Sequence, residues 1–283
     1  MPSSRDPKDW DLELLRLYQR ARVRNGNRHN KPKEWERIAI LEAFAKLRTP
    51  AADGARPRIL DLLPTHGMYS ELISAAHRDL AWTIADLSPE VLEFSTPRTV
   101  DPAAPLLYPP GQSQESADGA ARAPKGEFDL ALALFRLENL PPAERLPLMR
   151  YANEALKPGG RLILGFVNAR SYQPAMERWR LRGTGPKGVE YILAPDPSIG
   201  TFEALSEEAV ARLAAESGFR IVASLGYHIL PPRLEVEWRT RKRSELSKKL
   251  AKPLGAASDF LGRFEGLRRR LGRLRFLALE RAV

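Results

Sequence analysis

The sequence predicts an α/β protein with a doubly wound, mostly parallel sheet, and three observations lead to this prediction. Over residues 58–228, short apolar segments alternate with longer segments of helical periodicity. The apolar run FDLALALFRL (128–137) suits a strand that is covered on both faces. Loop sequences such as TPAADGARP (49–57) and KPGG (157–160) separate the segments. Alternation of this kind favours parallel strands with helices on both faces of the sheet.

Two helices are expected before the alternating region. Residues 9–24 and 33–48 carry large apolar side chains at helical spacing. These are Trp10, Leu14, Leu17 and Tyr18 in the first segment, and Trp35, Ile38, Leu41, Phe44 and Ala45 in the second. We expect residues 1–54 to form a helical segment on the substrate side of a larger domain, residues 55–283. Trp10 and Trp35 are expected to pack this lid against the sheet, and stacking on a substrate is the alternative.

The alternating region contains six expected strands. They are placed at 58–63, 80–86, 105–110, 128–137, 161–168 and 218–228, and the third of them is weak. Helices are expected at 68–77, 88–95, 142–156 and 206–217. Ser88 and Ser206 stand at the positions of N-caps, and Pro89 suits a first helical turn. Residues 111–126 (GQSQESADGAARAPKG) are expected to form a surface loop.

Two further segments are predicted to be insertions. Residues 169–204 combine aromatic and basic side chains, and Trp179 and Tyr191 there are placed to contact an acceptor. Residues 233–272 are helical by composition, with an interruption expected at Pro253. The segment RLRFLALE (273–280) fits either the end of that helix or a last strand.

Composition excludes several functional classes. The chain has no cysteine, so disulfides, thiolate metal sites and cysteine nucleophiles are excluded. Four scattered histidines argue against a histidine metal cluster, and we expect no metal site. The sequence contains no run of about 18 uncharged apolar residues, so no membrane span is expected. The N-terminal sequence lacks an apolar signal core, so we expect a soluble cytoplasmic protein, with peripheral attachment to a membrane left open.

The net charge of +10 is concentrated in one region of the chain. Residues 239–283 contain 14 Lys and Arg against 4 Asp and Glu, whereas residues 1–238 contain 31 of each. A neutral body with one basic region indicates a local contact. For 239–272 a solvated helix face is one interpretation and an anionic membrane surface the other. Nucleic acid is an unlikely partner, because few aromatic side chains are available to stack on bases.

Candidate ligand-binding residues follow the predicted strands, since ligands of such sheets bind at the carboxyl ends of the strands. Asp86 ends the second strand, where a carboxylate can accept two hydrogen bonds from the hydroxyls of a ribose. A helix-capping acid is the alternative for Asp86. The loop at 63–67 can offer backbone N–H groups to a nucleoside cofactor. Asp61, within the first strand, is favoured as a structural or loop-anchoring acid in the cofactor site, and a catalytic acid is the alternative.

Four segments in order resemble the class I S-adenosylmethionine-dependent methyltransferases of the small-molecule and glycan type. They are ILDLLPTHGMYSELIS, ADLSPEVLEFS, GEFDLALALFRLENLPPAERLPLMRYANEALKPGGRLILGF and LSEEAVARLAAESGFRIV. The resemblance covers about residues 55–228, and its most specific part is ALKPGGRLILGF. It implies a Rossmann-like, seven-stranded, mostly parallel sheet whose last strand is antiparallel. That topology favours a strand over 273–280.

The resemblance also implies S-adenosylmethionine as the cofactor and assigns residues to its binding. Asp86 resembles the acid that binds the ribose, and Leu87 would flank the adenine. Gly67 matches the last glycine of a G-x-G-x-G loop, in which Leu63 and Thr65 occupy the other two glycine positions. The segment beneath the methionine part of the cofactor corresponds to Leu134, Phe135 and Leu137.

The sequence departs from the family pattern at two places. A side chain at Leu63 is expected to crowd the space of the methionine carboxylate, because β-carbons resist the left-handed backbone that glycines adopt. The resulting strain would be a few kcal/mol. After the third strand no acid matches the one that meets the adenine amino group, and Gln112 and Asp118 are poor substitutes.

Transfer of a methyl group depends mainly on positioning, since the sulfonium is already activated. A hydroxyl acceptor also needs a base, and the candidates are His66, Glu138, Tyr172 and His228. For each of them a polar residue that only lines the site is the alternative. The resemblance therefore implies methyl transfer to an O or N atom of a small molecule, a glycan or a lipid-linked precursor. A catalytically inactive protein of the same fold, acting in binding or as a scaffold, is the second hypothesis.

Overall fold

The strands of the sheet lie in the order β3-β2-β1-β4-β5-β7-β6. Strands are added on one side of β1 as far as β3 and on its other side from β4 onwards, so the strand order switches between β1 and β4. In this computed structural model, residues 34–48, 56–64, 67–108, 124–172, 204–240 and 245–282 are described. The strands are β1 (Arg58–Leu62), β2 (Ala81–Asp86), β3 (Leu106–Leu107), β4 (Phe128–Leu134), β5 (Leu156–Val167), β6 (Phe219–Tyr227) and β7 (Leu274–Arg281). Neighbours pair in parallel except at β7, which is antiparallel to both β5 and β6. The predicted seven-stranded sheet with an antiparallel last strand is confirmed.

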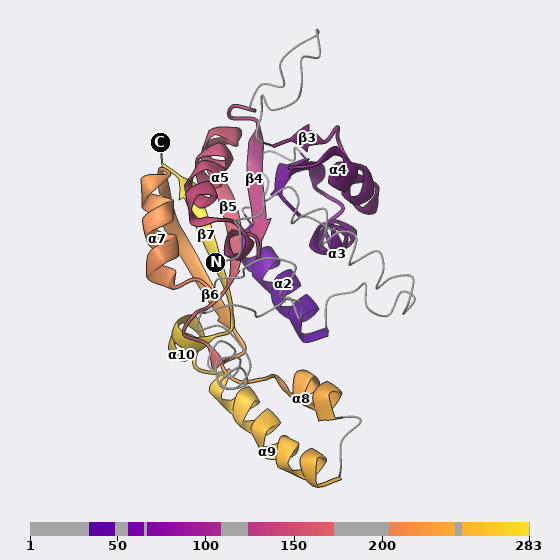
Figure 1. The fold of residues 1–283 in the computed structure, drawn as a ribbon, viewed down its shortest axis with the longest axis vertical. Helices are drawn as coiled ribbons and strands as arrows, with labels where there is room; N and C mark the ends of the chain where they lie inside the picture. The colour runs from indigo at the N-terminus through magenta and orange to yellow at the C-terminus, as the bar shows by residue number, and fades with distance from the viewer. Residues whose placement is uncertain are drawn as a thin grey trace, which may run out of the picture.

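Helices cover both faces of the sheet (Figure 1). The helices α2 (Glu34–Leu47) and α3 (Met68–Ala76) bury their apolar residues on one face, together with Ile59 of β1. On the other face, α5 (Pro142–Ala155) and α7 (Glu207–Glu216) pack with the neighbouring Leu60. Successive residues of a strand point to opposite faces of the sheet, and helices cover both faces. Residues on both faces are therefore apolar, which explains the mostly apolar central strands.

Short elements connect these layers. After β2 come α4 (Pro89–Ser95) and a 3-10 turn, η2 (Thr96–Arg98), and after β4 comes η3 (Leu137–Asn139). The predicted cap of α7 is confirmed, since the Ser206 hydroxyl accepts a hydrogen bond of 3.1 Å from the backbone N–H of Ala209. Ser88 stands at the N-cap of α4, but its hydroxyl bonds the carboxylate of Glu90 rather than the backbone.

The buried face of α2 differs from the predicted one. Trp35 and Phe44 are buried as expected, whereas Ile38 is 49% exposed. Beside these two aromatic residues, the helix buries smaller side chains that lie along the same face, namely Ala39, Ile40, Ala43 and Leu47. Ile38 lies about 100° around the helix from Ala39, and this rotation leaves it in solvent.

Two strand boundaries also differ from the predicted ones. β4 ends at Leu134 rather than at residue 137, because Phe135 adopts a left-handed backbone with φ 54°. β5 already begins at Leu156, so KPGG belongs to the strand instead of ending the helix. Its pairing with β4 contains an irregularity between Phe128 and Leu130, which accommodates these residues.

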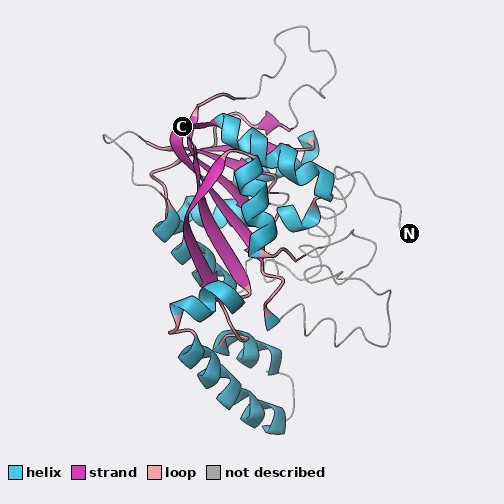
Figure 2. Ribbon diagram, turned by 90° about the vertical axis from the view of Figure 1, so that its left-hand side faces the viewer, coloured by secondary structure: helices cyan, strands magenta, loops and turns pink. Residues whose placement is uncertain are grey.

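The insertion between β6 and β7 forms α8 (Arg233–Thr240), α9 (Glu245–Leu261) and α10 (Glu265–Leu271). The expected break at Pro253 is wrong, because α9 runs through this residue. Pro253 lies inside this helix and is exposed. Figures 1 and 2 show α8 and α9 side by side, beyond the end of the sheet. None of the helices in the described ranges is long and apolar enough to cross a membrane.

Several expectations concern residues outside the described ranges. These are the helix at 9–24 with Trp10, most of the loop at 111–126 with Gln112 and Asp118, and the aromatic residues Trp179 and Tyr191. The division into residues 1–54 and 55–283 and the insertion at 169–204 therefore stay predictions.

Candidate active site

The carboxyl ends of β1, β2, β4 and β5 lie at one edge of the sheet, because these strands are parallel. β7 begins at the same edge, where its Leu274 pairs with Val167 of β5 and with Tyr227 of β6. Segments that follow the parallel strands and those that precede β7 therefore meet there. We call this the C-terminal edge.

The loop from β1 to α3 contains two left-handed residues, Leu63 with φ 53° and Gly67 with φ 64°. A β-carbon at Gly67 would lie 3.2 Å from Cβ and 3.3 Å from the carbonyl oxygen of Ser95, so both backbone angle and space require glycine here. Gly67 is the N-cap of α3. Thr65 and His66 lie outside the described residues. The predicted strand before this loop and the predicted helix after it are confirmed.

Leu63 adopts a left-handed backbone, the conformation that favours glycine. Its N–H donates to the carbonyl of Ala85 on β2 at 2.7 Å, and its side chain is 1% exposed. That side chain belongs to the core cluster on the α5 face, together with Leu60 and Leu62. We expected this side chain to crowd the space of a methionine carboxylate, whereas the structure packs it in the core. The left-handed backbone costs about 1–3 kcal/mol, and burial of the side chain offsets this cost.

Two buried carboxylates belong to β1 and β2. Asp86 ends β2 and is fully buried, and its Oδ1 accepts a hydrogen bond of 2.7 Å from the N–H of Leu87, which is half-buried. Asp61 is also buried, and its Oδ2 has no hydrogen-bond partner. Burial raises the pKa of Asp61 to about 7, and the nearby Ser70 hydroxyl lowers it less. A buried carboxylate oxygen without a partner is costly, which makes Asp61 a candidate to bind a ligand.

Aromatic packing holds the residues at the end of β4. The N–H of Phe135 donates to the carbonyl of Gly165 at 2.7 Å. Its ring lies 5.5 Å from that of Tyr69 on α3 and 5.8 Å from that of Phe276 on β7. Leu134 is half-buried beside it, and Leu137 is buried in the core. Phe135 therefore joins three elements at the C-terminal edge.

Glu138 connects the ends of β4 and β5. Its Oε1 accepts a hydrogen bond of 2.5 Å from the N–H of Val167, while its Oε2 has no partner. Burial raises the pKa of Glu138 to about 8, although hydrogen bonds from the backbone and the charges of Arg145 and Arg136 lower it. At pH 7 this group is mostly protonated, so it can donate a proton more readily than accept one.

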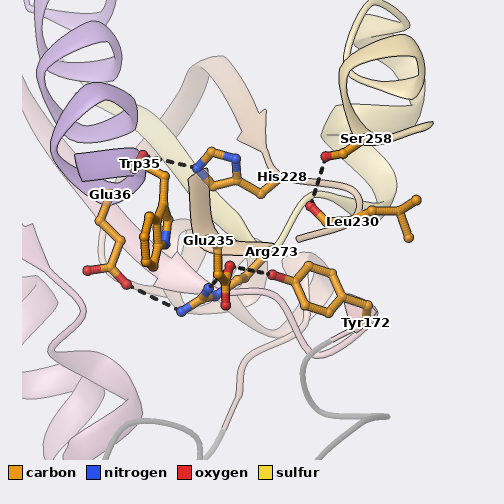
Figure 3. A network of polar contacts seen from close by, with 8 residues as sticks. All are labelled: Trp35, Glu36, Tyr172, His228, Leu230, Glu235, Ser258 and Arg273. Atoms are coloured by element: carbon orange, nitrogen blue, oxygen red, sulfur yellow. Dashed lines mark hydrogen bonds and ion pairs between the residues drawn. The ribbon is translucent and has the colours of Figure 1, made fainter. Parts of the chain in front are cut away.

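The other two candidate bases belong to a network shown in Figure 3. His228 is left-handed with φ 63°, and its Nε2–H donates to the carbonyl of Trp35 on α2 at 3.1 Å. Burial lowers the pKa of His228 to about 4, so the ring is neutral at pH 7. The hydroxyl of Tyr172 donates to Oε2 of Glu235 on α8 at 3.2 Å, and burial raises the pKa of Tyr172 to about 12.

Arg273 is the centre of this network, and the sequence analysis missed it. Its guanidinium bonds Glu235 at 3.1 Å and Glu36 of α2 at 3.4 Å (Figure 3). Burial disfavours the charged form, but Tyr172 and the two carboxylates outweigh burial and raise the pKa of Arg273. A basic residue at the start of the apolar strand 274–279 was the available signal. Nothing in the sequence marked Glu36 or Glu235 as its partners.

The structure thus brings Glu138, Tyr172 and His228 to the C-terminal edge, each with a hydrogen-bond partner. Asp61, Leu63, Gly67, Asp86, Leu87, Leu134 and Phe135 reach the same edge from β1, β2 and β4. At pH 7 the three candidate bases differ: Tyr172 has a pKa of about 12, His228 has one of about 4, and Glu138, whose Oε2 has no partner, is mostly protonated. The site is therefore suited to orienting a reactive ligand rather than to strong base catalysis.

Comparisons with known proteins identify the fold. No family model and no curated protein matches the sequence. Among solved structures, the [4+2]-cyclase SpnF has 16% identity and a TM-score of 0.53, over 98% of this chain and 95% of that one. A SAM-dependent methyltransferase from Thermotoga maritima has 14% identity and a TM-score of 0.51, with 96% and 99% covered. One from Archaeoglobus fulgidus has 11% identity and a TM-score of 0.50, with 90% and 97% covered.

These likenesses agree with the observed strand order and the antiparallel β7. The chain therefore has the fold of the class I S-adenosylmethionine-dependent methyltransferases.

Proposed function

We propose that this protein binds S-adenosylmethionine and transfers its methyl group to an O or N atom of a small molecule, a glycan or a lipid-linked precursor. The observation that carries the proposal is the pair of buried carboxylates, Asp61 and Asp86, on adjacent parallel strands beside the left-handed loop. The fold alone is compatible with other activities, as one of its matches is described as a cyclase.

The side chains at this edge fit the chemical groups of the cofactor. Asp86 ends β2 as a fully buried carboxylate, and a carboxylate suits the hydroxyls of a ribose. The unpartnered Oδ2 of Asp61 suits the ammonium group of the methionine part, because an ammonium donates hydrogen bonds and carries the opposite charge. Phe135 and Leu134 would hold the apolar portion of that part.

When bound, the cofactor supplies a methyl group on a sulfonium, which is an activated electrophile. The residues of this chain contribute position, since His228 and Tyr172 fix α2 and α8 against the C-terminal edge by their hydrogen bonds. Glu138 keeps its proton at pH 7 and can hydrogen-bond an acceptor atom. An amine acceptor can react in its neutral form, so it needs no strong base from such a site.

Isothermal titration with S-adenosylmethionine and with its demethylated product tests the proposal. The wild type should bind both, and Asp86→Asn should bind about 10- to 100-fold more weakly, because one charge-assisted acceptor is lost while Oδ1 can still accept from Leu87. Equal affinity of this variant would refute the assignment to the ribose. No heat and no thermal shift with the wild type at millimolar ligand would refute cofactor binding itself.

A binding or scaffold protein without catalysis is the second candidate. Two of the three loop glycines are replaced, and the candidate bases Tyr172 and His228 are engaged in structural hydrogen bonds. Cofactor binding without methylation of any amine, hydroxyl or glycan acceptor in a radiolabelled methyl-transfer screen would favour this function.

A further inference from the structure

The turn between α9 and α10 exposes three large apolar side chains, which we call the α9–α10 corner: Phe260, Phe264 and Leu267. They are 57%, 46% and 39% exposed, respectively. The two phenylalanine rings lie edge to face with their centroids 5.4 Å apart. The corner therefore presents a continuous aromatic surface to solvent, which is costly unless something covers it.

Exposed arginines stand next to these apolar residues in the sequence. Arg263 lies between the two phenylalanines in sequence and is exposed. Arg270 is exposed as well and follows Leu267 by three residues on α10, so the two share a helix face. Arg269 is exposed and bonds the carboxylate of Glu265. The corner belongs to the segment that holds the whole excess of positive charge in the sequence.

The backbone under the corner is fixed to the domain. The Ser258 hydroxyl of α9 donates to the carbonyl of Leu230 at 3.2 Å (Figure 3). The side-chain amide of Asn168 donates to the carbonyls of Arg270 and Gly272, each at 3.0 Å. A β-carbon at Gly226 of β6 would lie 1.9 Å from the Arg268 carbonyl oxygen, so α10 packs directly on the strand. This anchoring presents the exposed side chains without a further cost in ordering.

We propose that the α9–α10 corner docks on an anionic lipid surface, with the two phenylalanines and Leu267 entering the boundary between headgroups and acyl chains. Aromatic side chains favour that boundary, and arginines gain free energy beside anionic headgroups. A second copy of the chain is disfavoured as the occupant, because two equally basic corners repel each other. Single-stranded RNA is also disfavoured, because the corner offers two aromatic rings, packed edge to face, where a strand needs a row of rings for successive bases.

Docking at this corner would also restrict the acceptor. The insertion that carries the corner leaves after Tyr227 of β6 and returns at Leu274 of β7, two paired residues at the C-terminal edge. The proposed active site lies at the same edge, so a lipid-linked acceptor is the member of the proposed acceptor class that this arrangement favours. This last step rests on the proposed function, whereas docking itself does not.

Co-sedimentation of the full chain with vesicles, in the absence of cofactor, tests docking independently of methyl transfer. The protein should pellet with phosphatidylglycerol-phosphatidylcholine vesicles at low salt and less at 0.5 M NaCl, roughly the range over which exposed charges become screened. Phe260→Ser with Phe264→Ser should weaken partitioning by roughly tenfold per ring, and Arg263→Gln with Arg270→Gln by about 25-fold in total. Ile38→Ser removes a similarly exposed apolar side chain on α2 and should leave partitioning unchanged.

Three results would overturn the proposal. They are absence of pelleting at both salt concentrations, equal pelleting with phosphatidylcholine alone, and unchanged partitioning of the double phenylalanine variant. Tighter binding of single-stranded RNA than of anionic vesicles at the same salt, lost in the arginine variant, would instead identify the corner as a nucleic-acid surface.

Discussion

Replacement of Leu63 by glycine restores the residue type that a left-handed loop position favours, yet we expect this variant to be less stable than the wild type. The structure gives two opposing effects. The change relieves about 1–2 kcal/mol of left-handed strain. It also removes a side chain that is 1% exposed and packed in the core, which costs about 2–5 kcal/mol. Glycine adds up to about 1 kcal/mol of backbone entropy in the unfolded chain.

The net expectation is a loss of about 2–3 kcal/mol in the free energy of unfolding, or a decrease of about 5–10 °C in Tm. Leu63→Ala separates the two effects. It also removes the packed atoms but keeps a β-carbon at φ 53°, so it should be less stable than Leu63→Gly by about 1 kcal/mol. Urea denaturation followed by circular dichroism measures all three proteins.

Two orders of stability would refute this reasoning. If Leu63→Gly is as stable as the wild type, the side chain does not contribute to the core. If Leu63→Ala is at least as stable as Leu63→Gly, the residue is not left-handed in solution.

Two further predictions concern the buried charges. Arg273→Met should lower the free energy of unfolding by about 3–5 kcal/mol, because it leaves the carboxylate of Glu235 buried without its cation; Lys46→Ala, which breaks an exposed pair on α2, should cost under about 1 kcal/mol in the same urea titration. The folded-state pKa of Asp61 is about 7 and its unfolded value is 3.8, so this group favours the folded state below pH 4 and progressively loses that effect up to pH 7. Asp61→Asn should therefore gain about 3 kcal/mol of stability relative to the wild type as the pH rises from 4 to 7. A difference in the free energy of unfolding that does not change with pH would exclude a buried, titrating Asp61.

The sheet could be predicted from the sequence because its signals are local. Mostly apolar runs define β1, β2 and β4, because both faces of these strands are covered by helices. Ser206 capped its helix as predicted, since a cap depends only on residues three positions away. Asp86 and the loop after β1 could be placed at the C-terminal edge as well, because parallel topology alone brings the strand ends together.

The remaining features depend on tertiary contacts that no local pattern encodes. Glu36 and Arg273 are 237 positions apart in sequence, and their pairing requires both α2 and β7 to be in place. The direction of the Leu63 side chain follows from the positive φ, which the sequence would not normally predict for leucine. Ile38 was misplaced because helical periodicity fixes the spacing of a stripe but not which of two neighbouring stripes faces the sheet.

The position of β7 between β5 and β6 sets the order in which the protein can be completed during synthesis. β7 follows β6 in the chain by the whole helical insertion, so the facing edges of β5 and β6 have no partner strand until residues 274–281 have left the ribosome. Unpaired strand edges are sites of aggregation. Nascent chains that stall before residue 274 are therefore expected to depend on chaperones, and Arg273 can link α2 to α8 only after that point.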